Sequence, residues 1–272
     1  MHVGHLRSTI IGDCICRLLE FCGHRVFPQN HVGDWGLQIG MVVCALQDAQ
    51  WEKGVCGLET LEDYYKRISR AVEEDADVAK RVREWTVRLQ NEDSGTMAFW
   101  RSARVITLTE CFRIYECLNT IRAKNIYGES EYREDLPVVV EDLKNQELAK
   151  ESEGAVCVFP EGFKDKEGKP LPVIVQKSDG AYLYATTDLA AIRYRVDELK
   201  ADKIIYVTDA RQSLHFAMVF AVAKMAGWDK KPKKSAGETP TIQSAGETPT
   251  TRTEFVHVTF GSVLGENGKP LK

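Results

Sequence analysis

The sequence lacks a long hydrophobic run, which argues against a membrane-spanning helix. Such a helix needs about 18 or more consecutive apolar residues, and charged or polar side chains interrupt every apolar stretch of this chain. The N-terminal stretch is interrupted in the same way and does not fit the apolar segment of a signal peptide. We therefore expect neither a membrane partner nor an export signal.

The sequence also lacks an excess of positive charge. It has 36 lysine and arginine residues against 40 aspartate and glutamate residues, which gives a formal net charge of −4 at pH 7. The chain as a whole therefore has no basic footprint for nucleic acid. Any RNA partner must contact a local patch or a region outside this chain.

A third absence is the C-x-x-C pair, because the eight cysteines are scattered through apolar stretches. A zinc site is therefore not expected, and we expect no bound metal. Scattered cysteines of this kind indicate buried free thiols in a reducing compartment, which favours the cytoplasm. The cysteines are Cys14, Cys16, Cys22, Cys44, Cys56, Cys111, Cys117 and Cys157.

The chain does have enough apolar material for a folded core. It is 272 residues long and 43% hydrophobic, which suits one large α/β domain or two smaller ones. Apolar residues at helical spacing predict a helix from Leu6 to Phe21, ended by Gly23. Residues 25–30 are expected to form a short strand, and a second helix is expected to run to about Leu46.

The middle of the chain changes character near residue 131. Residues 58–124 are charged and periodic, which predicts several amphipathic helices. Residues 131–178 contain short apolar stretches separated by glycine and proline, which predict short strands. The expected strands lie at 136–143, 154–159 and 171–176.

The last third alternates between strand and helix patterns, which implies a parallel sheet. The expected strands are 180–185, 203–210 and 254–261, and the expected helices are 186–199 and 211–227. The heptad SAGETPT, which occurs twice within residues 232–252, interrupts this alternation. A repeated segment that contains glycine, proline and threonine, placed between a helix and a strand, predicts a surface insertion that the fold tolerates.

Two histidines, His2 and His5, flank Gly4 at the start of the first predicted helix. Side chains at this spacing share a helix face and could bind a metal ion, but the helix offers no convincing third ligand beside them. Alternatively, the helix N-terminus offers unpaired N–H groups and partial positive charge to a phosphate. Gly4 would let a base or a phosphate approach the backbone closely.

A second group of polar residues surrounds the predicted parallel strands. Tyr184 lies four residues before Asp188 at the start of a predicted helix, which Thr186 or Thr187 could cap. The simplest role of Asp188 is a charge that complements the helix dipole. A binding role is the alternative.

The polar residues Asp209, Gln212 and His215 follow the strand predicted at 203–210. They therefore lie at the carboxyl edge of the predicted sheet, where open α/β sheets bind their ligands. These residues, together with Tyr184 and Asp188 after the neighbouring predicted strand, form a candidate site at this edge.

Five stretches of the sequence together resemble arginyl-tRNA synthetases. Residues 2–5 match the His-Ile-Gly-His signature of class I aminoacyl-tRNA synthetases. The stretches occur in the family's order and span nearly the whole chain outside the insertion. They are HVGHLRSTIIGD, NHVGDWG, YATTDLAA, IIYVTDARQSLHF and FGSVLGENGK.

The resemblance implies an α/β fold with the Rossmann-like parallel sheet of class I synthetases, split by a helical and β-containing insertion. Residues 1–50 and 179–272 would form the two halves of the nucleotide-binding fold, and residues 51–178 the inserted region. The family's first strand and its C-terminal helical domain have no counterpart in these residues. We therefore expect a fragment of the enzyme that is inactive alone.

The resemblance also implies a reaction. L-arginine and ATP, with Mg²⁺ and no tightly bound cofactor, would form arginyl-adenylate, and the arginyl group would pass to tRNA(Arg). The tRNA would bind mainly through domains outside this chain, and assembly with other synthetases stays open. The attacking carboxylate is already an anion, so activation needs no general base and depends on positioning and charge stabilisation.

Site roles follow from the same resemblance. The catalytic residues would be His2 and His5, which with Gly4 would also contact ATP. Asp209 and His215 would complete the ATP site. For arginine, Asp188 would bind the guanidinium, since this group pairs with carboxylates in a bidentate manner. Tyr184 would shape that pocket, Gln212 would bind the amino-acid end, and His5 would lie close to the bound arginine.

Two other functions remain open. A nucleotidylyltransferase also uses an H-x-G-H motif on a similar fold, but would lack the pair formed by Tyr184 and Asp188 and the long insert. A truncated paralogue acting as a binding or scaffold module is the non-catalytic alternative.

Overall fold

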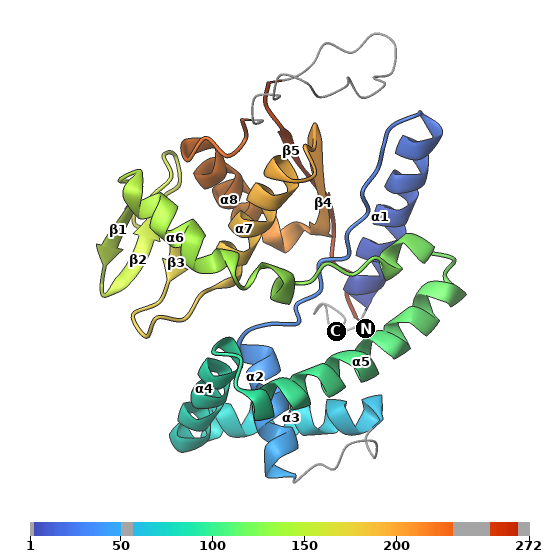
Figure 1. Ribbon diagram of the computed structural model, residues 1–272, viewed down its shortest axis with the longest axis vertical. Coiled ribbons are helices and arrows are strands. Elements are labelled where there is room, and N and C mark those ends of the chain that lie inside the picture. The colour runs from blue at the N-terminus through green and yellow to red at the C-terminus, as the bar shows by residue number, and fades with distance from the viewer. Residues whose placement is uncertain (1–2, 50–56, 231–250, 266–272) are drawn as a thin grey trace. The chain divides into compact units, whose positions relative to one another are not determined.

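The computed structural model describes residues 3–49, 57–230 and 251–265. The chain divides into two compact units (Figure 1), one made of residues 1–28 and 134–272 and the other of residues 29–133. The repeated heptads and His2 lie outside the described residues.

The second unit is helical. Its α-helices are α2 (Leu37–Asp48), α3 (Leu58–Glu74), α4 (Ala76–Gln90) and α5 (Ser94–Cys117), followed by the short 3₁₀ helices η1 (Ile121–Lys124) and η2 (Glu129–Tyr132). Asp75 caps α4 and Asp93 caps α5, each through a carboxylate that accepts backbone N–H groups of the first turn. The amphipathic helices predicted for 58–124 are thus confirmed.

The core of this unit forms where α2 packs against the other helices. Leu46 of α2 packs with Leu61 of α3 and Ala103 of α5. The backbones of α2 and α4 approach closely at Gly40, where an added Cβ would lie 2.0 Å from Thr86 Oγ1. Only glycine fits at this crossing without displacing Thr86.

The first unit contains both sheets. One is an antiparallel three-stranded sheet of β1 (Ala149–Ser152), β2 (Ala155–Val158) and β3 (Val173–Gln176). The other pairs β4 (Lys203–Asp209) with β5 (Glu254–Phe260) in parallel, in the register Lys203 to Glu254. Its helices are α1 (Val3–Phe21), α6 (Asp135–Asn145), α7 (Tyr184–Asp197) and α8 (Ser213–Met225), with the 3₁₀ helix η3 (Ala210–Gln212) between β4 and α8.

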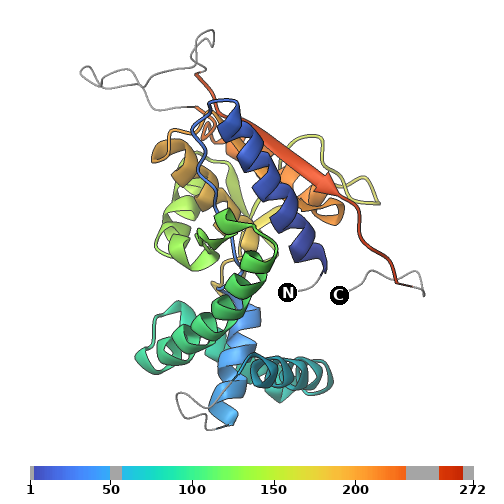
Figure 2. The ribbon, with the colours of Figure 1, turned by 90° about the vertical axis from the view of Figure 1, so that its right-hand side faces the viewer.

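The α/β alternation predicted for the last third is largely confirmed. The strands at 203–210 and 254–261 and the helices at 186–199 and 211–227 form close to their expected bounds, and the two strands are parallel. Helix α7 buries Leu189, Ile192 and Val196 as the periodicity indicates. Figure 2 shows α1 alongside the β4–β5 pair, where the hydroxyl of Ser8 donates to the carbonyl of Val207.

Three strand predictions are wrong. Residues 136–143 form most of α6, because the buried positions Leu136, Val139, Val140 and Leu143 repeat at helical spacing. Residues 180–185 contribute only an isolated bridge from Tyr182 to Gln176 before α7 begins. Residues 25–30 make only the bridge from Asn30 to Ile126, and Pro28 has no N–H to donate to a ladder.

Neither threonine caps α7. Leu183 is the N-cap residue and provides no side-chain hydrogen bond. The buried hydroxyl of Thr186 donates instead to the carbonyl of Val175 on β3, at 2.5 Å. This bond fixes the start of α7 against the antiparallel sheet.

The apolar residues of α1 are less buried than their spacing suggests. Ile10, Leu18 and Phe21 are exposed, Phe21 to 91%. Cys14 on the same helix is also exposed, as are Cys22 and Cys117, so the prediction of buried thiols is wrong for these three. Cys44 and Cys157 are buried, and all seven cysteines in the described ranges are free thiols.

No helix within residues 3–49, 57–230 or 251–265 has both the length and the apolar character needed to cross a membrane. The part of the chain that the structure describes also holds no group of three or more histidine, cysteine, aspartate or glutamate side chains suited to a metal ion.

Candidate functional site

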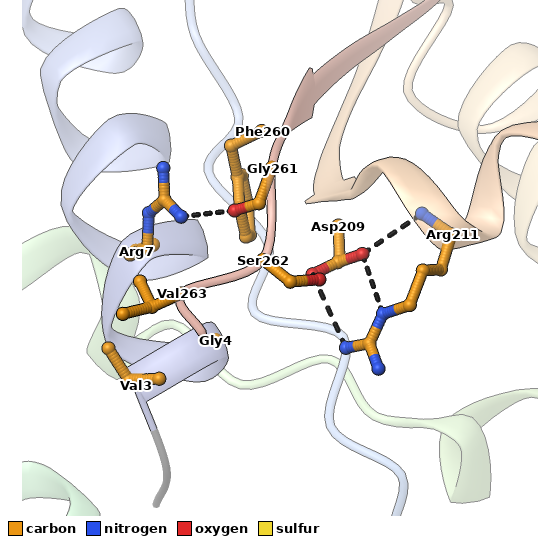
Figure 3. Close-up of a pocket in the computed structure, with 9 residues that line it drawn as sticks. All are labelled: Val3, Gly4, Arg7, Asp209, Arg211, Phe260, Gly261, Ser262 and Val263. Carbon is orange, nitrogen blue, oxygen red and sulfur yellow. Dashed lines mark hydrogen bonds and ion pairs between the residues drawn. The ribbon is translucent and has the colours of Figure 1, made fainter. Parts of the chain in front are cut away.

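A pocket lies where the first turn of α1 meets the ends of β4 and β5 (Figure 3). The α1 side contributes Val3, Gly4 and Arg7, and the strand ends contribute Asp209 and Phe260. Arg211, Gly261, Ser262 and Val263 complete the lining. The N-terminal end of a helix carries partial positive charge, and the first turn of α1, which lines this pocket, has no acidic side chain to offset it. Such an arrangement suits an anion.

Asp209, at the end of β4, organises one side of the pocket. Its Oδ1 accepts hydrogen bonds from the backbone N and the Nε of Arg211, at 2.9 and 2.8 Å. Its Oδ2 accepts from Ser262 Oγ at 2.8 Å. The bonds from Arg211 hold the pKa of the Asp209 carboxyl far below its usual value, and the Ser262 bond lowers it further. Asp209 therefore stays ionised and holds Arg211 at the pocket rim.

Arg7 provides a second cation on the opposite side of this pocket, as Figure 3 shows. Its guanidinium donates to the carbonyl of Gly261 and lies 5.0 Å from the centroid of the Phe260 ring. Arg7 and Arg211 were both missed by sequence reasoning. The available signal was their position, since each follows a predicted site residue by two places in the sequence.

A second cluster lies between α7 and α8. The Nε2 atom of His215 is 2.6 Å from Asp188 Oδ2, and both side chains are largely buried. The ring centroid of Tyr184 is 4.6 Å from that of His215. Asp188 itself is only 7% exposed, whereas Tyr184 is 61% exposed. The cluster thus combines a buried carboxylate with an exposed aromatic ring.

Other aromatic rings continue from this cluster into the parallel sheet. Phe216 has its ring centroid 5.0 Å from that of His215 and 4.7 Å from that of His257. His257 on β5 forms a 2.7 Å hydrogen bond with Thr208 Oγ1. Burial lowers the pKa of His257, and neighbouring His215 lowers it further.

The structure thus brings the predicted site residues together in two groups. Gly4 and Asp209 line the pocket, whereas His215 contacts both Asp188 and Tyr184. Gln212 is exposed at the end of η3, between β4 and α8. His5 is exposed next to Gly4 in α1 and is not among the residues that line the pocket.

Comparisons with known proteins give a consistent result. The family described as tRNA synthetases class I (R), catalytic domain, matches residues 1–238. The chain is 43% identical over 277 residues to the arginine–tRNA ligase of Alcanivorax borkumensis and 45% identical over 276 residues to that of Shewanella baltica. All of this chain is covered in both comparisons, but it spans only 44% of the length of either relative.

Solved structures agree on the fold. The arginyl-tRNA synthetase of Plasmodium falciparum superposes with a TM-score of 0.74 at 32% identity, over 97% of this chain and 41% of that one. The arginyl-tRNA synthetase of Thermus thermophilus, at 18% identity, supports the fold alone, with a TM-score of 0.60 over 99% of this chain and 48% of that one. The predicted α/β fold of class I synthetases is confirmed.

Proposed function

Because the chain belongs to the family of class I arginyl-tRNA synthetase catalytic domains, we propose that the full-length protein carrying it is an arginine–tRNA ligase. It joins L-arginine to ATP as arginyl-adenylate and transfers the arginyl group to tRNA(Arg). The observation that carries this proposal is the buried Asp188 carboxylate, which bonds to His215, whose ring contacts the exposed ring of Tyr184. A carboxylate in this setting suits the planar, permanently charged guanidinium of arginine.

Arginine binds at the cluster between α7 and α8. Asp188 accepts hydrogen bonds from the guanidinium, and Tyr184 shapes the entrance to this position. Gln212 and His5 bind the amino-acid end. Gln212 lies at the end of η3, which follows β4 at the carboxyl edge of the parallel pair. Ligands of open α/β sheets occupy this edge, which supports the assignment.

ATP, with Mg²⁺ as its counter-ion, binds at the pocket below the first turn of α1. Gly4 lets the nucleotide approach the backbone, while His2, His5 and the helix N-terminus stabilise charge on the α-phosphate. Arg7 and Arg211 line the same pocket and add two cations for the phosphates. Asp209 holds Arg211 there, and the family resemblance also assigns Asp209 and His215 to ATP.

The activation step needs no proton transfer from the protein. A carboxylate oxygen of arginine attacks the α-phosphorus of ATP, and the bond from that phosphorus to pyrophosphate breaks. Since the nucleophile is already an anion, rate enhancement comes from holding the reactants in line and from stabilising charge on the phosphate. We place this reaction in the cytoplasm, with tRNA(Arg) bound mainly by parts of the protein outside this chain.

Arginine-dependent ATP–pyrophosphate exchange by the purified full-length protein tests the proposal. The assay includes tRNA(Arg) and compares the twenty standard amino acids one at a time. We expect exchange with arginine and at most background exchange with the others. Equal exchange with another amino acid, or ATP turnover that ignores all of them, would contradict the proposal. The matches to arginine–tRNA ligases favour this outcome over the nucleotidylyltransferase alternative.

A further inference from the structure

We infer that His215 is a positioning residue for the arginine site, which holds the Asp188 carboxylate in place, and is not an ATP contact. This inference rests on the proposed function and changes the role that the family resemblance gives to this histidine. The observation behind it is the 2.6 Å separation of His215 Nε2 and Asp188 Oδ2 in a largely buried setting.

The direction of this hydrogen bond follows from its partners. An ionised carboxylate can only accept, so Nε2 of His215 carries the hydrogen and donates it. A hydrogen bond to a charged group is among the stronger ones in proteins. Asp188 Oδ2 is therefore held by a donor that comes from a different helix, α8.

The imidazole itself contacts two aromatic rings. Its centroid lies 4.6 Å from that of Tyr184 on α7, with an interplanar angle of 53°. The centroid of Phe216 lies 5.0 Å away at 66°, an edge-on contact. Contacts at such distances favour particular ring orientations. His215 thus presents Nε2 to Asp188 in one direction, which in turn limits the rotation of the carboxylate.

Fixing the carboxylate matters because a guanidinium recognises it by geometry. The paired N–H groups of the guanidinium fit the two oxygens of a carboxylate only when the planes are suitably aligned. Binding sites depend on neighbours that lock the rotamers of the residues touching the ligand. In this protein His215 supplies that support for Asp188.

The position of His215 also separates it from the pocket near α1. The residues lining that pocket come from α1, the end of β4 with Arg211, and residues 260–263. His215 is not among them, and it contacts Asp188, Tyr184 and Phe216 instead. Two of these three residues belong to the proposed arginine site.

A matched pair of substitutions separates the two roles. In His215→Gln the side-chain amide nitrogen reaches the position of Nε2, whereas in His215→Asn it reaches only the position of Nδ1. Arginine-dependent ATP–pyrophosphate exchange with the full-length protein and tRNA(Arg) gives KM for arginine and for ATP. We expect His215→Asn to raise KM for arginine about 10- to 100-fold, as loss of a hydrogen bond to a charged group does. KM for ATP should stay within about twofold, and His215→Gln should recover most of the loss.

His257→Gln is the control, because His257 also contacts Phe216 but bonds to Thr208 rather than to Asp188. It should leave KM for arginine unchanged. A rise in KM for ATP in the His215 variants, with KM for arginine unaffected, would overturn the inference. Equal defects in the Gln and Asn variants would overturn it as well.

Thermal unfolding followed by circular dichroism accompanies the kinetics. If His215→Asn does not fold, His215→Phe replaces it, because phenylalanine keeps the ring contacts and removes the donor. If neither variant folds, His215 is a structural residue and the inference is wrong. Failure of the wild-type protein to use arginine would contradict the proposed function instead, and this is seen before any variant is made.

Discussion

Two buried aspartates, Asp34 in the helical unit and Asp188 in the α/β unit, show that burial alone does not identify a binding residue. Their exposed fractions are nearly equal, 6% and 7%. Asp34 accepts hydrogen bonds from Arg104 Nε at 2.7 Å and from the backbone N and Oγ of Ser130, both at 2.9 Å. Asp188 instead bonds to an imidazole beside an exposed tyrosine.

The guanidinium at Asp34 comes from the chain itself. Arg104 belongs to α5 and Ser130 to η2, so that this carboxylate ties the loop before α2 to two further segments. Trp100 adds to the same junction by donating from Nε1 to the backbone carbonyl of Asp34, at 2.7 Å. Asp34 is therefore a structural residue. Under the proposed function, Asp188 makes the equivalent carboxylate–guanidinium pair with a substrate.

Asp188→Asn gives the largest expected effect. Polar recognition of this kind discriminates by about 10⁴-fold or more, and kcat/KM for arginine should fall by that order. KM for ATP and the unfolding temperature should change little. Asp197→Asn, at the other end of α7, makes the same chemical change outside the cluster and should leave exchange unaffected. A fall of less than about tenfold for Asp188→Asn would show that this carboxylate does not bind the guanidinium.

Asp34→Asn should produce the opposite pattern. Removing one partner of a fully buried ion pair costs about 3–5 kcal/mol, and the partial exposure of Arg104 lowers our expectation to about 2–3 kcal/mol. Urea unfolding measures this loss, and KM for arginine should not move. Glu131→Gln is the control, since Glu131 lies 3.5 Å from the same arginine but is exposed. A stability loss as large in the control would mean that the Asp34 network is not the cause.

Gly128→Ala tests the same junction by sterics. An added Cβ would lie 2.6 Å from Asp34 Oδ1, and overpacking of this kind costs about 1–3 kcal/mol. Gly12→Ala on α1 is the control, because its Cβ would meet nothing within 4 Å, and alanine favours a helix over glycine. Urea unfolding should show a loss for the first variant and none for the second. Equal stability in both would indicate that the loop before η2 relaxes freely.

Asp209 gives the smallest expected effect, which depends on pH. Because its folded pKa lies below the usual value, its bonds to Arg211 and Ser262 add stability above the unfolded pKa of about 4. That contribution is lost as the pH falls toward the folded pKa. The difference in unfolding temperature between wild type and Asp209→Asn should thus be constant from pH 7 to 5 and shrink below about pH 4. If the difference in unfolding temperature grew on acidification instead, the folded pKa of Asp209 would lie above its unfolded value, which contradicts this prediction.

The sequence predicts the regular parts of this fold where a local pattern is sufficient. The strand ending at Asp209 and the helix after it were predicted correctly, because apolar runs and periodicity are local signals. A short apolar stretch in a region divided by glycine and proline predicts a strand at residues 136–143, although the buried positions repeat at helical spacing. Helical periodicity was the better guide there than the length of the apolar stretch and its flanking residues.

The sequence indicates Tyr184, Asp188 and His215 as candidate residues, but it indicates neither their contacts nor Arg7 and Arg211 of the pocket. The group formed by Tyr184, Asp188 and His215 depends on how α7 and α8 pack, and Asp188 and His215 are 27 residues apart. No local pattern specifies such a pairing. The exposure of Phe21 on α1 could not be predicted for the same reason. The spacing of apolar residues predicts an apolar face of the helix, but not whether another element covers that face.

The choice between arginine and citrulline, its neutral urea analogue, isolates the charge that Asp188 contributes. The measured quantity is the ratio of kcat/KM for the two amino acids in ATP–pyrophosphate exchange, in the full-length wild type and in Asp188→Asn. We expect wild type to prefer arginine by about 10³-fold or more, and the variant to prefer it by less than about tenfold. An unchanged preference in a folded Asp188→Asn protein would contradict the assignment of Asp188 as the guanidinium-binding residue.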